Sequence, residues 1–190
     1  MVTNLLFLIL FLLNPFISDS KNPASATNEE TGILWTNSRR LTWDDFKSPA
    51  DEKESLHAMT STNIAVKANC IGNQMRFEVK CVFVTKDSWT KNRMSHKLLA
   101  HEQMHFDLTE VHARLLRQKL NETAAVCGNS RLKLDPIVEK HFAAWKSEQD
   151  QYDEETNHGL LEEKQKVWEE KIANRLAQLE SFSYRTYALK

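Results

Sequence analysis

The chain has 190 residues, with 25 Lys and Arg against 26 Asp and Glu, and its hydrophobic fraction of 41% is ordinary for a globular protein. This length favours one domain with room for a terminal extension. Because the charges nearly cancel and are interspersed, neither nucleic acid nor an anionic membrane surface is expected as a partner.

The first 20 residues are typical of a secretory signal peptide. Leu5 to Leu13 form an apolar run that is too short to span a bilayer comfortably and suits the apolar region of a signal peptide. Ser18 and Ser20 supply small residues at a cleavage site, so the mature chain would begin near Lys21. Since no basic residue precedes the run, an uncleaved anchor is the alternative. We expect a secreted or periplasmic protein with no stable membrane span after cleavage.

The segment at residues 21–32 is polar and rich in turn-forming residues, and it is predicted to be a linker. The folded domain is then expected over residues 33–190. Ile33–Trp35 is predicted to form a short strand, and Leu41–Phe46 to form a turn anchored by aromatic side chains that pack in the core.

Residues 62–67 and 75–84 are predicted to form a β-hairpin around Gly72-Asn73. The second segment alternates apolar and polar residues, which indicates one buried and one solvated face. The edge of such a hairpin can hold an extended peptide as it passes the helix predicted from Ser95 to Leu120. A hairpin that merely covers the helix is the alternative.

The three cysteines are Cys70, Cys81 and Cys127, and in an oxidising compartment one disulfide and one free thiol is the simplest outcome. A tight turn at Gly72-Asn73 would place Cys81 near Ile64 and not opposite Cys70. A bridge from either strand cysteine to Cys127 is therefore at least as well supported as one between the strand cysteines. Their spacing assigns no cysteine to a metal.

A metal-binding pattern H-E-x-x-H occupies His101 to His105, within a helix predicted from Ser95 to Leu120. Ser95 can cap this helix. His101 and His105 lie one turn apart on one face, so both imidazoles can bind a zinc ion at about 2.0–2.1 Å. Glu102 could then act as general base on a water whose pKa zinc lowers from about 15.7 to about 7. A coincidental match on a charged helix is the alternative.

Two further helices are predicted after the helix from Ser95 to Leu120, which is called here the metal helix. The first has Asp135 as N-cap and Pro136 at its first position, and it ends at His158-Gly159, where Gly can adopt the left-handed conformation. A second amphipathic helix follows from Leu160 to Leu179.

The metal helix cannot supply a third ligand by itself. His112 lies seven residues beyond His105, about 10.5 Å along the axis at about 1.5 Å per residue, which is too far for one ion. Asp107 points to a different side of the helix, so an outer or structural role suits it better.

The third ligand is therefore expected from another element, and His158 is preferred. It lies beside Gly159, where the backbone can approach another helix closely. Asp153 or Glu155 could hydrogen-bond an imidazole from outside the ligand set. The alternatives for the third ligand are His141, Glu139, Glu155 and other carboxylates.

Four blocks, Leu41–Phe46, Asp87–Trp89, His101–Asp107 and Tyr152–Gly159, occur in this order. On these blocks the chain resembles a bacterial family of predicted secreted zinc-dependent proteases, otherwise described as a domain of unknown function. The resemblance covers about residues 33 to 170 and implies a zincin-like α+β fold and an exported protein. We expect a small antiparallel sheet packed on the metal-bearing helix, with two further C-terminal helices. The last block contains His158 but not His141.

The leading hypothesis is a secreted zinc-dependent peptidase that acts on protein or peptide substrates, with His101, His105 and His158 as ligands and Glu102 as general base. Tyr152 is a candidate for stabilising the oxyanion, and packing in the core is the alternative for this residue. The second hypothesis is a non-catalytic secreted zinc-binding structural or interaction protein. Its site would be closed by four protein ligands.

Overall fold

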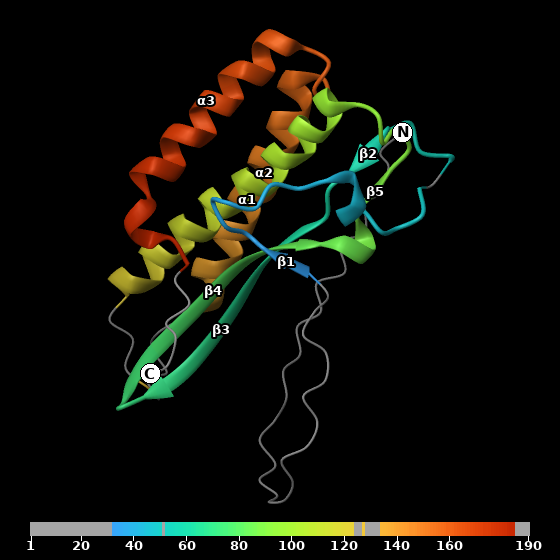
Figure 1. The fold of residues 1–190 in the computed structure, drawn as a ribbon. Helices are drawn as coiled ribbons and strands as arrows, with labels where there is room; N and C mark the ends of the chain where they lie inside the picture. Colours follow the sequence, from blue (N-terminus) through green and yellow to red (C-terminus); the bar gives the residue numbers. More distant parts are fainter. Residues whose placement is uncertain (1–31, 51, 124–126, 128–133, 185–190) are drawn as a thin grey trace, which may run out of the picture.

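The computed structural model describes residues 32–50, 52–123, 127 and 134–184. Within them the chain forms an α+β fold with a three-stranded antiparallel sheet in the order β1-β4-β3, a two-stranded ribbon β2-β5 and three helices (Figure 1). The elements are β1 (Gly32–Leu34), β2 (Ala58–Met59), β3 (Thr62–Ile71), β4 (Gln74–Val84), β5 (Trp89–Thr90), α1 (His96–Glu122), α2 (Leu134–Thr156) and α3 (Glu162–Gln178). Short 3-10 turns are η1 (Trp43–Asp45), η2 (Thr85–Asp87) and η3 (Glu180–Phe182).

The predicted signal peptide at residues 1–20 and the linker up to residue 31 lie outside the described residues. Gly32, which the prediction assigned to the linker, is already the first residue of β1, where it pairs with Val84. In the described part of the chain, no helix has both the length and the apolar character needed to cross a membrane.

The β3-β4 hairpin confirms the predicted turn. Gly72 and Asn73 have φ values of 57° and 62°, the positive values that a two-residue type I′ turn requires. This turn sets the register in which Ile64 lies opposite Cys81, as expected from the sequence. In the order β1-β4-β3, β3 comes last and is paired with β4 on one side, so it is an edge strand of this described sheet.

A disulfide joins Cys70, near the tip of this hairpin, to Cys127 beyond the end of α1. It therefore ties the hairpin to the chain at the C-terminal end of the long helix, which runs beside it (Figure 1). Of the three bridges left open by the sequence, this is the one between the first strand cysteine and Cys127. Cys81 is a free thiol in the core, where burial raises its pKa well above the usual value.

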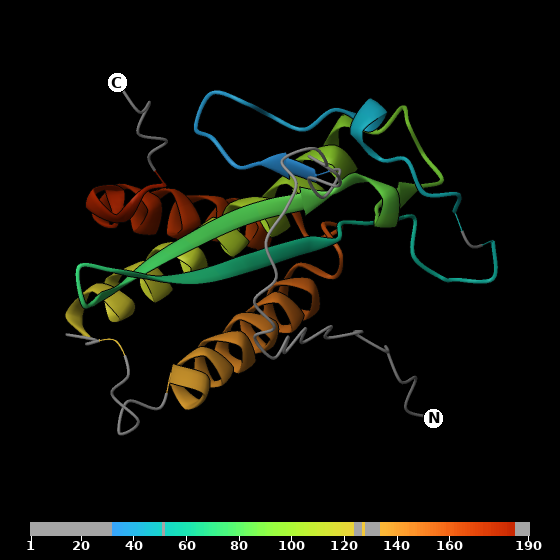
Figure 2. The ribbon, with the colours of Figure 1, turned by 90° about the horizontal axis from the view of Figure 1, so that it is seen from below.

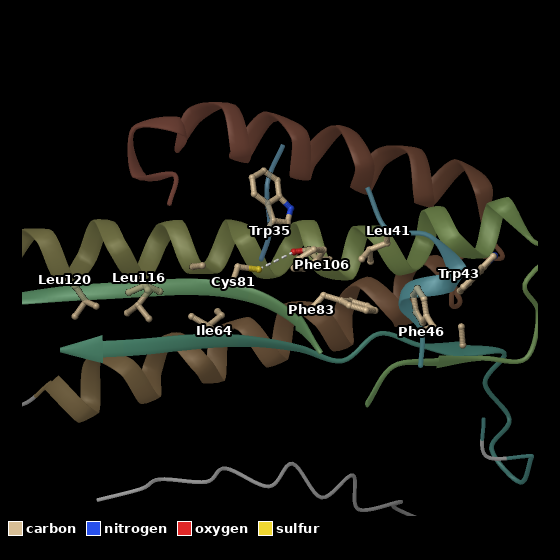
Figure 3. Packing of buried hydrophobic residues seen from close by; sticks show 13 residues of the cluster. Trp35, Leu41, Trp43, Phe46, Ile64, Cys81, Phe83, Phe106, Leu116 and Leu120 are labelled. Carbon is tan, nitrogen blue, oxygen red and sulfur yellow. Dashed lines mark hydrogen bonds between the residues drawn. The ribbon is translucent and has the colours of Figure 1, made fainter. Parts of the chain in front are cut away.

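Helix α1 is the central element. The Ser95 side chain accepts a hydrogen bond from the Leu98 amide at 3.1 Å, so the predicted cap is confirmed, and the helix runs two residues beyond the predicted Leu120. The sheet packs on one side of α1, and α3 lies on the opposite side (Figure 3). Figure 2, a view from below, shows α2 on the side of the β3-β4 hairpin opposite to α3.

The larger apolar core lies between α1 and the sheet. Phe83 of β4 is at its middle, with ring centroids 5.1 Å from Phe46 and 5.8 Å from Phe106 (Figure 3). Trp43 and Phe46 are both buried here, which confirms the core packing expected for the aromatic turn. A second core joins α1 to α2 and α3 and consists of Met104, Leu108, Val111, Tyr152, Trp168 and Ile172.

The start of α2 differs from the prediction. The helix already includes Leu134, so Asp135 lies within its first turn and is not the N-cap. A carboxylate there still interacts favourably with the positive end of the helix dipole. α3 begins at Glu162, two residues later than expected, and buries Trp168 and Ile172, which agrees with the amphipathic helix expected there.

Asp107 has the structural role that its direction on α1 suggested. Its carboxylate accepts hydrogen bonds from Trp35 Nε1 at 2.8 Å, Gln103 Nε2 at 2.9 Å and Arg40 at 2.9 Å. Gln103 Oε1 in turn accepts the Leu41 amide at 2.7 Å. These contacts hold the segment after β1 against α1, on the side away from the two histidines.

A buried charge cluster fastens the C-terminal part of the chain. Glu110 pairs with Arg114 at 2.9 Å and Arg117 at 2.8 Å, and all three residues are buried. Arg114 also donates to Leu176 O, and Arg117 donates to Val79 O and to Phe182 O. One carboxylate thus holds two cations that connect α1 to the sheet, α3 and η3.

Candidate metal centre

Three polar atoms from two helices converge beside α1. His101 Nε2 and His105 Nε2 are 3.2 Å apart, and Asp153 Oδ1 of α2 lies 3.1 Å from each of them. Ligands placed tetrahedrally around zinc at about 2.0–2.1 Å are separated by about 3.3–3.4 Å. The spacing of these three atoms, called here the His–His–Asp cluster, therefore fits three ligands of one zinc ion.

The electrostatics of the cluster favour a bound positive charge. Burial alone would lower the pKa of His105, but its hydrogen bond with Asp153 and the charge of that carboxylate outweigh burial and raise the pKa to about 9. Burial alone would raise the pKa of Asp153, but hydrogen bonds with His101 and His105 hold it well below its usual value. Asp153 is thus an anion that faces two imidazoles and can bind a cation together with them.

The Nδ1 atoms of His101 and His105, which lie on the far side of each ring from Asp153, contact glutamine side chains. His105 Nδ1 lies 2.7 Å from Gln149 Oε1 of α2, and His101 Nδ1 lies 3.2 Å from Gln165 Oε1 of α3. The Nε2 atoms are consequently the ones directed at Asp153. All three helices contribute to the orientation of the two histidines.

The turn between α2 and α3 closes over the first histidine. Asn157, His158 and Gly159 have φ values of 48°, 52° and 77°, all in the left-handed region. A Cβ atom on Gly159 would lie 2.9 Å from both Cβ and Cγ of His101. The close backbone approach and the left-handed glycine expected from the sequence are therefore present, and the approach is to a ring of the metal helix.

His158 lies at the rim of the cluster. Its side chain is 52% exposed, and its Nδ1 atom is 3.4 Å from Asp153 Oδ1. Ligand atoms of His101, Asp153 and His158 all fall within 4.8 Å of one another. The structure thus brings His158 to the site, and it also places Asp153, which the sequence considered by name for an outer role, 3.1 Å from both helical histidines.

Tyr152 lies in the core, the alternative that the sequence left open. Its ring stacks on His101 with centroids 4.7 Å apart, and its hydroxyl lies 3.2 Å from His101 O and 2.9 Å from Gln165 Oε1. Both oxygens are acceptors, so the hydroxyl proton is engaged inside the protein and does not face a substrate. This geometry gives Tyr152 a supporting contact with His101, and the role as oxyanion donor stays a prediction.

Glu102 is buried, with an exposure of 3%, yet its carboxylate has no hydrogen-bond partner among the described residues. Among the described residues, Trp43 Nε1 is the side-chain N or O atom that is both fully buried and without a partner. The Glu102 oxygens have no partner either but are not fully buried, so they keep some contact with solvent. The Glu102 charge also contributes to raising the pKa of His105, which places the carboxylate near the cluster. A buried, unpaired carboxylate beside two imidazoles indicates a functional group.

The remaining candidates lie away from the cluster. His112 Nε2 is 2.8 Å from Glu148 Oε2, which agrees with the prediction that His112 is too far from His105 to share an ion. His141 Nδ1 lies 3.0 Å from Ile137 O in its own helix. Glu155 accepts a hydrogen bond from Trp168 Nε1 at 2.9 Å, and Glu139 is exposed.

The pattern in α2 contains a signal for Asp153 that the sequence reasoning did not use. Gln149, Tyr152, Asp153 and Thr156 are spaced by three and four residues, so they share one face of a helix. Gln149, Tyr152 and Asp153 all contact α1. The spacing of four that grouped His101 with His105 therefore groups Asp153 with Gln149, which contacts His105.

Comparison with known proteins identifies one family. Residues 25–159 match the model of a family described as "Bacterial protein of unknown function (DUF922)". The match includes the H-E-x-x-H pattern, Asp153 and His158. No curated protein and no solved structure matches the chain.

The contact between Gly159 and His101 leads to a prediction about stability. Replacing Gly159 by Ala should lower the free energy of unfolding by about 1–2 kcal/mol through the left-handed backbone, with a further loss of about 1–3 kcal/mol because the new methyl overlaps His101. The control is Gly72→Ala, which has a similar φ of 57° but no atom within 4 Å of the new methyl. Urea unfolding followed by circular dichroism measures both. Equal losses in the two variants would contradict the predicted overlap.

Proposed function

The chain belongs to this DUF922 family of bacterial proteins, and we propose that it is a zinc-dependent peptidase whose metal is held by His101, His105 and Asp153. The observation that carries the proposal is the mutual spacing of 3.1–3.2 Å among the three ligand atoms. Two imidazole nitrogens and one carboxylate oxygen form a ligand set typical of catalytic zinc sites. Three protein ligands leave a tetrahedral position for water.

Glu102 is the proposed general base. A zinc ion held by His101, His105 and Asp153 would supply a water of lowered pKa, about 7, and would polarise a carbonyl group. Glu102 follows the first ligand in the sequence and is buried with 3% exposure, and its carboxylate has no hydrogen-bond partner among the described residues. It can therefore accept a proton from the attacking water and pass it to the leaving amine.

The position of β3 supports a peptide as substrate. β3 is the edge of its sheet, so its outer backbone groups are available to pair with an extended chain. The Thr60 hydroxyl donates to the Glu102 carbonyl at 3.3 Å, and the hydroxyls of Thr62 and Thr109 are 2.8 Å apart. These contacts hold the beginning of the edge strand beside the metal helix. A helix carrying the metal pattern under such a strand supports a zincin-like fold.

The location outside the cytoplasm is also a proposal. The Cys70–Cys127 disulfide supports an oxidising compartment, which agrees with the signal peptide expected at residues 1–20. We propose that the protein is secreted or periplasmic.

A closed structural zinc site is the second candidate, and the position of His158 favours it. His158 Nδ1 is 3.4 Å from Asp153 Oδ1, near the distance between two ligands of one ion. If this ring completed the coordination, no position would remain for water. The unpaired Glu102 carboxylate argues for catalysis, because a closed site has no use for it.

Purified protein should bind about one zinc ion per chain and hydrolyse peptides from a mixed peptide library. In Glu102→Gln, hydrolysis should fall by at least about 10²- to 10⁴-fold, because the amide cannot accept the proton, while zinc content is retained. Metal analysis and mass spectrometry of the products measure the two effects. Glu163→Gln on the exposed face of α3 is the control. Full activity in Glu102→Gln would exclude Glu102 as the base.

The ligand assignment predicts different effects of Asp153 and His158 on zinc affinity. Asp153→Ala should weaken zinc binding by more than about 100-fold, beyond the effect typical of an outer hydrogen-bonding residue. His158→Ala should change the affinity by less than about 10-fold, because the ring is at the rim. Competition with a chromogenic chelator measures both constants. Loss of zinc in His158→Ala would instead support the closed four-ligand site.

If the protein is exported, cleavage of the signal peptide should leave a defined N-terminus. Expression of the full chain in a bacterial host should yield a soluble extracytoplasmic protein that begins near Lys21. Terminal sequencing of the exported protein, with the Ser18 and Ser20 positions changed to Lys as a processing-defective control, tests this. Recovery of intact Met1 in the membrane fraction would favour an uncleaved anchor.

A further inference from the structure

We propose that Gln149 and Gln165 are positioning residues of the metal centre, which hold the protons of His105 and His101 on Nδ1 so that both Nε2 lone pairs face Asp153. This inference rests on the proposed zinc site and deepens it. It assigns a role to two polar side chains, from two different helices, that neither the metal pattern nor the family match identifies.

The orientation of the Gln149 amide is determined by its other contacts. Its Nε2 lies 3.0 Å from the His105 backbone carbonyl, which can only accept a hydrogen bond. The amide nitrogen must therefore face this carbonyl, and Oε1 must face His105 Nδ1, 2.7 Å away. Because Oε1 can only accept, Nδ1 must carry the proton. Nε2 of the same ring is then free to bind a metal.

The same reasoning applies to Gln165, which is buried in α3. Its Nε2 donates to the Glu169 carboxylate at 3.1 Å, so its Oε1 faces His101 Nδ1 at 3.2 Å. The Tyr152 hydroxyl also lies 2.9 Å from this oxygen and 3.2 Å from the His101 carbonyl, and because both neighbours are acceptors the hydroxyl acts as the donor. An oxygen that receives a hydrogen bond from Tyr152 can receive a second one from His101 Nδ1.

With both protons on Nδ1, the three atoms of the His–His–Asp cluster are all electron-pair donors. Such atoms repel one another at 3.1–3.2 Å unless a proton, as in the hydrogen bonds with Asp153 described above, or a metal ion lies among them. Metal-bound histidines commonly donate their other N–H to a carboxylate or carbonyl, which fixes the tautomer. Here the partners are neutral amides, which orient the rings without adding negative charge beside Asp153 and Glu102.

The test compares variants that remove the accepting oxygen with variants that keep it. Gln149→Met and Gln165→Met have similar volume and no acceptor, whereas Gln149→Glu and Gln165→Glu retain an acceptor for Nδ1–H. Gln151→Met is the matched control, because Gln151 lies on the exposed side of α2 and contacts Glu155. Circular dichroism first establishes that each full-length, disulfide-bonded variant is folded.

The first readout is the zinc dissociation constant. Each Met variant should bind zinc about 10- to 100-fold more weakly than the wild type, and each Glu variant should recover most of this loss. Gln151→Met should bind zinc as the wild type does. If the wild-type chain fails to bind zinc, the proposed metal site and this inference both fail. If the wild type binds zinc and both Met variants bind it equally well, the inference alone is overturned.

The second readout is the ring spectrum of ¹⁵N-labelled, zinc-loaded protein. In the wild type, His101 and His105 should bind the metal through Nε2 and show Nδ1 protons protected from exchange with solvent. Gln149→Met should remove the protection of the His105 proton alone, and Gln165→Met that of the His101 proton alone. A general loss of structure would affect both rings together. Coordination through Nδ1 in the wild type, or equal loss of both signals in each variant, would overturn the proposal.

Discussion

The structure depends on the burial of α1, a helix that is surrounded by other elements although it carries many polar side chains. Its buried polar residues are His101, Glu102, Gln103, Asp107, Thr109, Glu110, His112, Arg114 and Arg117. A polar group removed from water without a partner is strongly destabilising, so each of these side chains requires a matching group on a neighbouring element. Asp107 meets Trp35 after β1, Glu110 holds the arginines that reach the sheet and η3, and His112 meets Glu148 of α2. These pairings and the two apolar cores together hold the described elements around α1.

Glu102 departs from this rule, and the departure is informative because it lies beside the His–His–Asp cluster. Every other buried polar side chain of α1 has a protein partner in the described part of the chain, whereas the Glu102 carboxylate keeps contact with solvent. Natural proteins retain such unfavourable groups mainly where function requires them. The proposed peptidase uses this carboxylate as a base. A purely structural metal site offers no physical reason for leaving it unpaired.

The cluster also links metal binding to the packing of the three helices. α1 supplies two imidazoles, α2 supplies Asp153 and Gln149, and α3 supplies Gln165, while the turn at Gly159 closes over His101. A metal bound only when these helices are packed together would stabilise the folded state by mass action. The disulfide at the far end of α1 fastens the hairpin independently of the site. The domain therefore has one covalent connection and one proposed metal connection, near opposite ends of the same helix.

The sequence by itself determined features that depend on local geometry. The spacing of four between His101 and His105 places both rings on one face of a helix, Ser95 caps that helix, and the turn at Gly72-Asn73 brings Ile64 opposite Cys81. The tertiary structure decided which groups from distant segments meet these features. Sequence periodicity does not report the rotation of α2 about its own axis or the direction of a side chain at a helix end, so it could not rank Asp153 against His158 or separate Tyr152 in the core from Tyr152 at a substrate. Those choices depend on how α2 and α3 pack on α1, because only that packing brings a carboxylate oxygen within 3.1 Å of two imidazoles.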